Sequence, residues 1–387
     1  MYRRFLTKEL TELAKQYPVV TVIGPRQSGK TTLVRHVFPG KPYVNLEALD
    51  TQEMARSDPR SFLGRYPEGA IFDEIQRVPP LLSYIQLIVD ERQRKGMFIL
   101  TGSHQLELHQ AITQSLAGRT ALLNLLPMSL AELTEAGVEL SLDEAVFKGG
   151  YPRIFNDKLD PTKAYRNYFQ TYIERDLRQL IHVKDLVQFQ RFVRLCAGRI
   201  GQLLNLEGLG NEVGVSSPTI KEWVSLLEAS FIAIRLQPYY ENFGKRIIKS
   251  PKLYFTDVGL ATYLLGIENI DQLSRDPLRG HLVENLVLLE LIKARLNQGL
   301  DPQLYYFRDT HGHEIDCIFQ SANNLIPIEI KAAQTFTKDF LKNLYFFQNS
   351  VGDRCKKGFL IYAGDQEQSI ESFHIINYRH ASQIVST

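Results

Sequence analysis

Gly24-Pro-Arg-Gln-Ser-Gly-Lys-Thr31 fits the pattern G-x-x-x-x-G-K-[ST] at every fixed position. The apolar, β-branched run Val-Val-Thr-Val-Ile at 19–23 precedes it, which predicts a short buried strand. The segment TTLVRHVF at 31–38 follows it with helical character. A loop between a strand and a helix is the context that this pattern requires, so an ordinary glycine-rich turn is the weaker interpretation.

Such a phosphate loop directs successive backbone N–H groups at phosphate oxygens, which leaves no room for side chains at the glycine positions. Lys30 then reaches the β and γ oxygens, and the Thr31 hydroxyl binds Mg²⁺. The motif therefore predicts a nucleoside triphosphate site. The residues expected to line it are Gly24, Pro25, Arg26, Gln27, Ser28, Gly29, Lys30, Thr31 and Thr32.

Length and composition describe a multidomain globular chain. Its 387 residues are more than one ordinary hydrophobic core accommodates, and about two to four domains are expected. No apolar run approaches the roughly 18 residues that a membrane span needs. Residues 1–17 predict an amphipathic helix without the apolar core of a signal peptide. We therefore expect a cytoplasmic protein with no membrane partner.

Cysteine spacing and net charge add little about function. Cys196, Cys317 and Cys355 are far apart and show no Cys-x-x-Cys or Cys/His spacing, so neither a zinc site nor a disulfide framework is predicted. A net charge of +2 neither requires nor excludes nucleic acid, because only a local basic patch would carry that information.

Short apolar segments alternate with helical ones after the phosphate loop, which predicts a mostly parallel sheet wrapped by helices. The segment Ala70-Ile-Phe ends in Asp73 and Glu74, an acidic pair at the carboxyl edge of a strand. We expect Asp73 to hold Mg²⁺ and Glu74 to polarise the attacking water. An Asp-Glu pair is common by chance, but its position after a phosphate loop supports the catalytic interpretation.

Two further residues are candidates for catalysis. Ser103 ends the strand that begins at Met97 and could sense the γ-phosphate or position water; a plain strand-ending turn is the alternative. Arg119 precedes the apolar segment 121–126 and could be an arginine finger that reaches the nucleotide of a neighbouring subunit. The alternative is a solvated arginine at the start of a strand.

The segments GPRQSGKTTL, FDE, LTGS, and LAGR followed by LLPMSLAEL resemble AAA-type ATPases of bacteria and archaea with a C-terminal domain of unknown function, the DUF 4143 group. The resemblance spans essentially the whole chain. It implies an AAA-like ATPase core at 1–127, ATP rather than GTP, Mg²⁺, and assembly into a ring or a homodimer. The chain has no guanine-reading N-K-x-D motif, which agrees with ATP.

The middle of the chain predicts helices. Residues 128–184 read as a helical lid and connector, broken at Gly149-Gly150 and Pro152, with a long amphipathic stretch at 168–181. Residues 185–270 predict a winged helix: three helices, a turn at 214–217, and two strands around a loop. Trp223 on the third helix is expected to face the interior. The cations of the loop are Lys245, Arg246, Lys249 and Lys252.

The function of this winged helix has two interpretations. DNA binding would place the third helix in a groove and the basic wing on phosphates. The composition of the third helix argues against direct base reading, because the negative charges of Glu222 and Glu228 offset the positive charge of Lys221. The other interpretation is a structural or protein-docking module.

Residues 275–387 predict a helix at 281–296, strands at 303–308, 314–319, 325–332 and 358–362, and a helix at 340–347. This order resembles the restriction-endonuclease-like fold with the PD-(D/E)xK signature. The matching residues are Asp316, Glu329 and Lys331, with Glu284 as the additional carboxylate. Period two places Glu329 and Lys331 on one face of their strand.

The sequence thus predicts an α/β fold class, with a P-loop AAA-like parallel sheet, a helical lid, a winged helix and a nuclease-like C-terminal domain. In the nuclease interpretation Asp316, Glu329 and Glu284 bind Mg²⁺, and Lys331 orients or deprotonates a water. The alternative is a binding-only version with a buried ion-pair network. The leading hypothesis is an ATPase that drives a DNA-directed module; the rival is an ATP-dependent scaffold or signalling switch that docks a protein partner.

Overall fold

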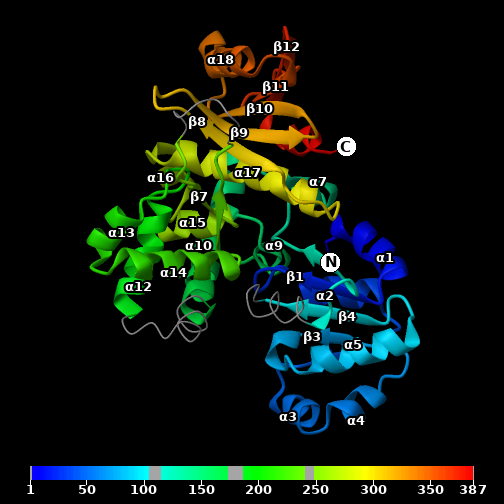
Figure 1. Cartoon of the computed structure of the whole chain (residues 1–387). Helices are drawn as coiled ribbons and strands as arrows, with labels where there is room; N and C mark the ends of the chain where they lie inside the picture. The colour runs from blue at the N-terminus through cyan, green and yellow to red at the C-terminus, as the bar shows by residue number, and fades with distance from the viewer. Residues whose placement is uncertain (1, 104–114, 173–185, 240–247, 387) are drawn as a thin grey trace. The chain divides into compact units, whose positions relative to one another are not determined.

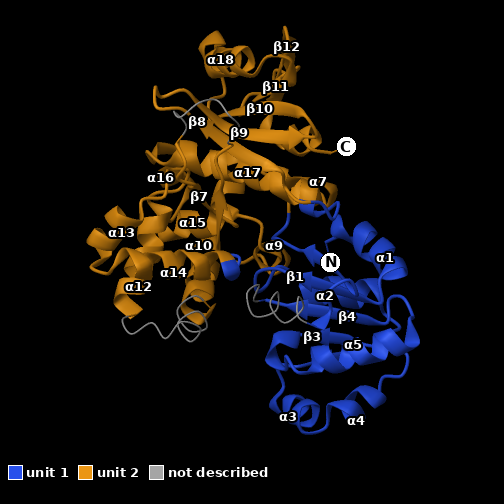
Figure 2. Cartoon of the chain, viewed as in Figure 1, with its two compact units in different colours: residues 1–128, 229–231, 296–300 blue, residues 129–228, 232–295, 301–387 orange. Residues whose placement is uncertain are grey.

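The computed structural model describes residues 2–103, 115–172, 186–239 and 248–386. It divides the chain into two compact units (Figure 2). Unit 1 comprises residues 1–128, 229–231 and 296–300, and unit 2 comprises residues 129–228, 232–295 and 301–387. The predicted α/β class is confirmed, because unit 1 contains a parallel sheet and the C-terminal part contains a separate mixed sheet.

A five-stranded sheet with the order β2-β3-β4-β1-β5 forms the centre of unit 1 (Figure 1). Every neighbouring pair is parallel. All residues of the central strands β1 and β4 are buried, as expected for a parallel sheet covered on both faces. The strands are β1 (Val19–Ile23), β2 (Tyr43–Asn45), β3 (Ile71–Asp73), β4 (Phe98–Gly102) and β5 (Thr120–Asn124). Their carboxyl ends lie at one edge, where α/β sheets bind ligands.

The helices of unit 1 pack on this sheet. The N-terminal helix buries Leu6, Leu10 and Ala14, spaced four residues apart along one face, against a core that includes Val20 and Val22. This agrees with the predicted amphipathic helix. The elements are α1 (Leu6–Gln16), α2 (Lys30–Val37), α3 (Leu49–Ser57), α4 (Pro59–Gly64), the 3₁₀ turn η1 (Ile75–Arg77) and α5 (Leu81–Arg92).

Unit 2 begins with short helices. Ser129 and Ser141 each form a capping box with a glutamate three residues later, which satisfies the first backbone N–H groups of α7 and α8. The helices are α7 (Leu130–Glu135), α8 (Leu142–Lys148), α9 (Pro152–Asn156) and α10 (Pro161–Tyr168). Most of the amphipathic stretch predicted at 168–181 lies outside the described residues.

Three helices and an antiparallel strand pair follow, which is the element order of a winged helix. Gly214, with φ of 85°, ends the second helix, and the third helix starts three residues later. Trp223 is buried with its ring 5.3 Å from those of Phe189 and Phe192, so it faces the interior as predicted. The elements are α12 (Leu186–Ala197), α13 (Leu206–Val213), α14 (Ser217–Ala229), β6 (Ala233–Leu236), β7 (Lys252–Phe255), α15 (Val258–Leu264) and α16 (Ile270–Arg275).

The C-terminal part of unit 2 is a mixed six-stranded sheet with the order β12-β13-β11-β10-β9-β8. β10, β11 and β13 are parallel, and the other pairs are antiparallel. α18 packs on β9 and β10 over an apolar core that includes Leu344 and Phe347. The elements are α17 (Arg279–Leu296), β8 (Leu304–Arg308), β9 (Glu314–Ser321), β10 (Asn324–Lys331), η3 (Lys338–Leu341), α18 (Lys342–Val351), η4 (Gly352–Arg354), β11 (Gly358–Tyr362), β12 (Gln368–Ile370), β13 (Phe373–Asn377) and η5 (Tyr378–Ile384).

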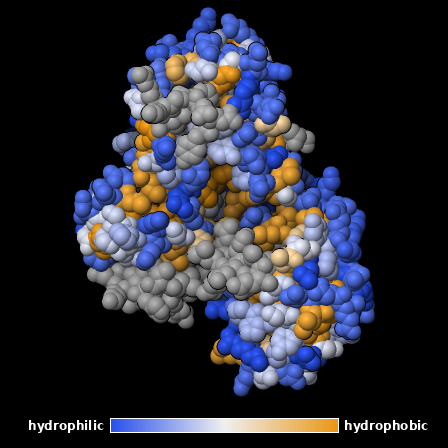
Figure 3. Space-filling model, viewed as in Figure 1, coloured by the Kyte–Doolittle hydropathy of each residue, from blue (hydrophilic) through white to orange (hydrophobic). Residues whose placement is uncertain are grey.

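Hydrophilic side chains cover much of the face drawn in Figure 3, with smaller apolar patches between them. Among the helices that the structure describes, none combines the length and the apolar character needed to cross a membrane.

Candidate functional site

The phosphate loop, residues 24–31, connects β1 to α2 at the carboxyl edge of the parallel sheet. A Cβ on Gly24 would lie 2.1 Å from the carbonyl oxygen of Leu125, so only glycine fits there. Gly29 and Gln27 have positive φ values of 94° and 62°. The backbone therefore turns sharply at the positions that the motif predicts.

Lys30 folds back over this loop. Its Nζ donates hydrogen bonds to the carbonyl oxygens of Gly24 at 2.9 Å and Pro25 at 2.8 Å. Burial lowers the pKa of Lys30, although the carboxylates of Glu74 and Asp73 oppose that shift. The ammonium group is thus held at the mouth of the loop by weak neutral acceptors, which phosphate oxygens can replace.

The carboxylate of Asp73 accepts hydrogen bonds from three hydroxyl groups on neighbouring elements. Thr31 Oγ1 donates to its carboxylate at 2.9 Å, and the Tyr43 hydroxyl on β2 donates at 2.7 Å. Thr101 Oγ1 on β4 donates to the same group. Thr31 and Asp73 are oxygen donors in direct contact, a donor set that fits Mg²⁺. Tyr43 was not singled out from the sequence, because a tyrosine on a short strand belongs to no motif.

Glu74 is held by two side chains, one from the residue that follows β4 and one from the turn η1. Ser103 Oγ donates to Glu74 Oε2 at 2.8 Å, and Gln76 Nε2 donates to the same oxygen. Burial would raise the pKa of Glu74, but the Lys30 ammonium and these two hydrogen bonds outweigh burial and hold the pKa below its usual range. Glu74 also has a φ of 57°, the kind of local strain that clusters at functional sites.

An arginine outside the motif supports the phosphate loop. Arg4 is buried, and its Nη1 donates to the carbonyl oxygen of Ser28 at 2.7 Å. Its Nη2 donates to the carbonyl oxygen of Leu126 at 2.6 Å. The guanidinium group therefore ties the loop to the end of β5. Sequence patterns gave no signal for this role, because the contact spans 122 positions.

Arg119 precedes β5 and forms a two-point ion pair with Asp90 on α5. Its Nε lies 2.5 Å from Asp90 Oδ1, and its Nη2 donates to Asp90 Oδ2 at 2.8 Å. Both side chains are partly exposed. This agrees with the surface arginine of the alternative interpretation, and the arginine-finger role stays a prediction.

The second predicted site lies in unit 2, where β9 and β10 bring Asp316, Glu329 and Lys331 together. Lys331 Nζ lies 2.7 Å from Glu329 Oε1 and 3.9 Å from Asp316 Oδ2. The backbone N–H of Ile330 donates to Asp316 Oδ2 at 2.8 Å. Burial, together with the charges of Glu329 and Glu284, raises the pKa of Asp316 well above its usual range. The predicted Asp and Glu-x-Lys set is thus assembled in space.

Glu284 on α17 is buried in the same region, and it contacts β7 as well as His281 on its own helix. Lys252 Nζ lies 3.1 Å from Glu284 Oε1 and 2.5 Å from Glu314 Oε1, and the Tyr254 hydroxyl donates to Glu284. Lys252 is 2% exposed, so it cannot contact DNA phosphates, and its assignment to a basic wing is wrong. Lys245 and Arg246 lie outside the described residues, while Lys249 is exposed.

A metal ion was predicted at Glu284, Asp316 and Glu329. Within the described residues, no group of three or more His, Cys, Asp or Glu side chains is arranged to hold one. Each of these carboxylates instead contacts a lysine ammonium group. This donor set does not fit a divalent ion while both lysines are in place, because the charge that would attract the ion is already compensated.

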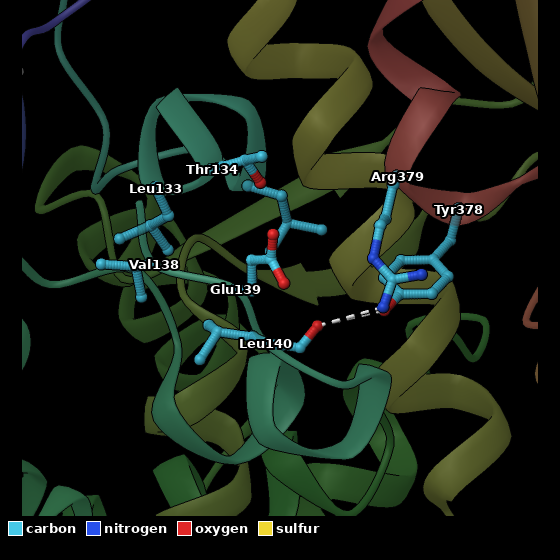
Figure 4. Close-up of a pocket in the computed structure, with 8 residues that line it drawn as sticks. Leu133, Thr134, Val138, Glu139, Leu140, Tyr378 and Arg379 are labelled. Carbon is cyan, nitrogen blue, oxygen red and sulfur yellow. Dashed lines mark hydrogen bonds between the residues drawn. The ribbon is translucent and has the colours of Figure 1, made fainter. Parts of the chain in front are cut away.

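Unit 2 also contains a pocket of about 230 Å³ between α7 and the C-terminal turn (Figure 4). Arg379 Nη2 donates to the carbonyl oxygen of Leu140 at 3.3 Å across one side of it. The lining residues are Leu130, Leu133, Thr134, Val138, Glu139, Leu140, Tyr378 and Arg379. None of them belongs to the predicted sites.

Known proteins resemble this chain along most of its length. A family model described as "AAA domain" matches residues 16–134. Two models for domains of unknown function, DUF8612 and DUF4143, match residues 139–271 and 279–381. An uncharacterised protein of Mycobacterium tuberculosis is 31% identical over 337 residues, covering 86% of this chain and 74% of that protein. A Haemophilus influenzae protein is 22% identical, covering 81% and 82%.

Solved structures are more distant. A Walker-type ATPase of Pyrococcus abyssi aligns with a TM-score of 0.47 and 15% identity, covering 68% of this chain and 96% of that one. AMPPCP-bound DnaA from Aquifex aeolicus aligns with a TM-score of 0.31 and 14% identity, covering 58% and 85%. The sequence matches, with the parallel sheet and its phosphate loop, show that this chain belongs to the family of AAA-type ATPases with a C-terminal DUF4143 domain.

Proposed function

We propose that this chain binds and hydrolyses ATP at the edge of the unit 1 sheet. The contact between Thr31 and Asp73, beside a Glu74 carboxylate that Ser103 and Gln76 hold, carries this proposal. These residues come from α2, β3, β4 and η1, and they converge only because the parallel strands end at one edge. Convergence of this kind supports phosphoryl transfer more strongly than any one motif does.

The residues divide the reaction between them. The N–H groups of the phosphate loop and Lys30 bind the phosphate oxygens, while Thr31 and Asp73 would hold Mg²⁺. When bound, Mg²⁺ neutralises charge on the β and γ oxygens. Glu74, ionised because its pKa is lowered, accepts a hydrogen bond from the attacking water and then its proton. Ser103 and Gln76 keep that carboxylate in one orientation.

Replacing Lys30 with alanine tests the assignment. We expect ATP hydrolysis by the purified full-length chain to fall by about 100-fold or more, because one charge-stabilising donor at a reacting group has that effect. Phosphate release at saturating MgATP measures the rate. The exposed Lys8 on α1 provides a matched control, and Lys8→Ala should keep the wild-type rate. Undiminished hydrolysis by a folded Lys30→Ala variant would refute the proposal.

The second candidate is that unit 2 contacts DNA without cleaving it. The winged-helix element order and the exposed Lys221 and Lys249 support DNA contact. The pairing of Asp316 and Glu329 with Lys331 argues against a metal-dependent cleavage step. The rival is a nucleotide-dependent switch that docks a protein partner through the same unit. Assembly into a homo-oligomer, with Arg119 acting between subunits, stays part of the proposal.

DNA contact predicts a measurable salt dependence. Lys221→Ala/Lys249→Ala should weaken binding of a duplex oligonucleotide and lower the slope of log affinity against log salt by about 1 to 2. Fluorescence anisotropy at several salt concentrations measures both quantities. An unchanged slope would remove these lysines from the interface, and no DNA binding by the wild type would favour the protein-docking switch. Cleavage of single-stranded, duplex or branched DNA in Mg²⁺ or Mn²⁺, lost in Lys331→Ala, would show that a nuclease is present.

A further inference from the structure

A lysine from the winged-helix strand β7 lies inside the nuclease-like site. Lys252 Nζ is 3.1 Å from Glu284 Oε1 on α17 and 2.5 Å from Glu314 Oε1 on β9. The ring of Tyr306 on β8 lies 5.6 Å from the same nitrogen. At 2% exposure, this ammonium group depends on its protein partners for stabilisation.

Lys331 pairs with the remaining carboxylates. It contacts Glu329 on its own strand and Asp316 on β9. The carboxylate cluster, here Glu284, Glu314, Asp316 and Glu329, therefore has an ammonium partner at every member. Arg308 adds a further cation, 3.3 Å from Glu314 Oε2.

This charge balance works against a divalent cation. Four carboxylates face the three cations Lys252, Lys331 and Arg308, so at most one negative charge remains uncompensated. Mg²⁺ and Mn²⁺ are held by carboxylates whose charge is available. Binding one here would require an ammonium group to leave its partners in a buried site, which is costly.

The position of Lys252 is fixed by the backbone of β7. The N–H of Phe255 donates to Asn285 Oδ1 at 2.7 Å, and Asn285 Nδ2 donates to the carbonyl oxygen of Phe255 at 2.9 Å. Asn285 is adjacent to Glu284 on α17, so one helix turn anchors both the strand and its lysine. This reciprocal pair holds the β7 backbone against α17 three residues from Lys252.

We propose that Lys252 is the resident cation of the carboxylate cluster and keeps the wild-type cluster closed to divalent metal ions. The cluster then acts as an ionic joint between β7 and the C-terminal sheet. Removing this one ammonium group, without changing the carboxylates, leaves more negative charge uncompensated and raises the affinity of the cluster for a divalent cation. This inference concerns unit 2 alone and is independent of ATP hydrolysis in unit 1.

Mn²⁺ binding to the full-length, nucleotide-free chain tests the proposal. Electron paramagnetic resonance of free Mn²⁺ measures the number of ions bound by wild type, Lys252→Met and Lys252→Met/Asp316→Asn. We expect Lys252→Met to bind one additional ion, at least about tenfold more tightly than the wild-type cluster does, because one compensating charge is gone. The double variant should lose that ion. Any Mn²⁺ at the Thr31 and Asp73 site is common to all variants.

The exposed neighbour Lys249 supplies the control, and Lys249→Met should match wild type. Circular dichroism establishes whether each variant folds. A folded Lys252→Met that binds no additional ion overturns the proposal. If Lys252→Met does not fold, substitutions in the otherwise wild-type chain decide the question. Asp316→Asn and Glu329→Gln should each bind as many Mn²⁺ ions as the wild type does. Loss of one ion in either variant would show that the wild-type cluster already holds a metal ion and would overturn the proposal.

Discussion

Replacing Glu74 with glutamine is expected to slow ATP hydrolysis by about 100- to 10,000-fold, the range that a positioned general base contributes. Glutamine keeps the size of the side chain and its hydrogen bond with Ser103, but it cannot accept a proton from water. ATP affinity should change by less than about threefold, because Glu74 lies beyond the phosphate loop. Single-turnover hydrolysis and fluorescent-nucleotide binding measure the two quantities separately.

Glu68→Gln is the matched control, because Glu68 is an exposed glutamate paired with Arg94. It should hydrolyse ATP at the wild-type rate. Hydrolysis by Glu74→Gln within about threefold of wild type would remove Glu74 from the general-base role. A second expectation comes from its pKa, which is held below the usual range. Glu74 is therefore ionised at neutral pH, so it should not produce an acid limb in the pH–rate profile near neutrality.

Local patterns were sufficient for the phosphate loop and the acidic pair. The loop, β1, α2 and the carboxyl end of β3 follow one another in sequence, so motif and periodicity place them together. Tyr43, Gln76 and Arg4 could not be found in this way. Tyr43 and Arg4 contact Asp73 and Ser28, which lie 30 and 24 positions away and meet them only through the tertiary fold. Gln76 lies only two positions from Glu74, but it belongs to no motif.

The second site shows the same limit more sharply. Asp316 lies on β9, and Glu329 and Lys331 lie on the adjacent strand β10. Period two predicted that Glu329 and Lys331 share a face of their strand, and their contact at 2.7 Å agrees with this. Lys252 was assigned to a solvent-facing wing because it follows a basic loop. Its burial results from β7 lying against α17, a tertiary contact across about 30 residues. The local sequence around a lysine at the start of a strand does not tell whether that lysine is exposed in a loop or buried in an ion pair.

The ionic joint predicts a large, partner-dependent loss of stability. Lys252→Met should lower the free energy of unfolding by about 3–5 kcal/mol, because it leaves the buried Glu284 without its lysine partner. Lys249→Met should change it by less than about 0.5 kcal/mol, since Lys249 is exposed. Urea unfolding gives the overall change, and hydrogen exchange of peptides covering β7 and α17 locates it.

Adding Glu284→Gln to Lys252→Met separates a charge effect from lost packing. If the penalty is the uncompensated carboxylate, the second substitution removes part of its cause and should restore about 1–3 kcal/mol, a coupling typical of contacting charged residues. Tyr254 can still donate its hydrogen bond to the glutamine oxygen. Strictly additive losses would mean that the Lys252 ammonium group and the Glu284 carboxylate do not stabilise each other, and the electrostatic account would fail.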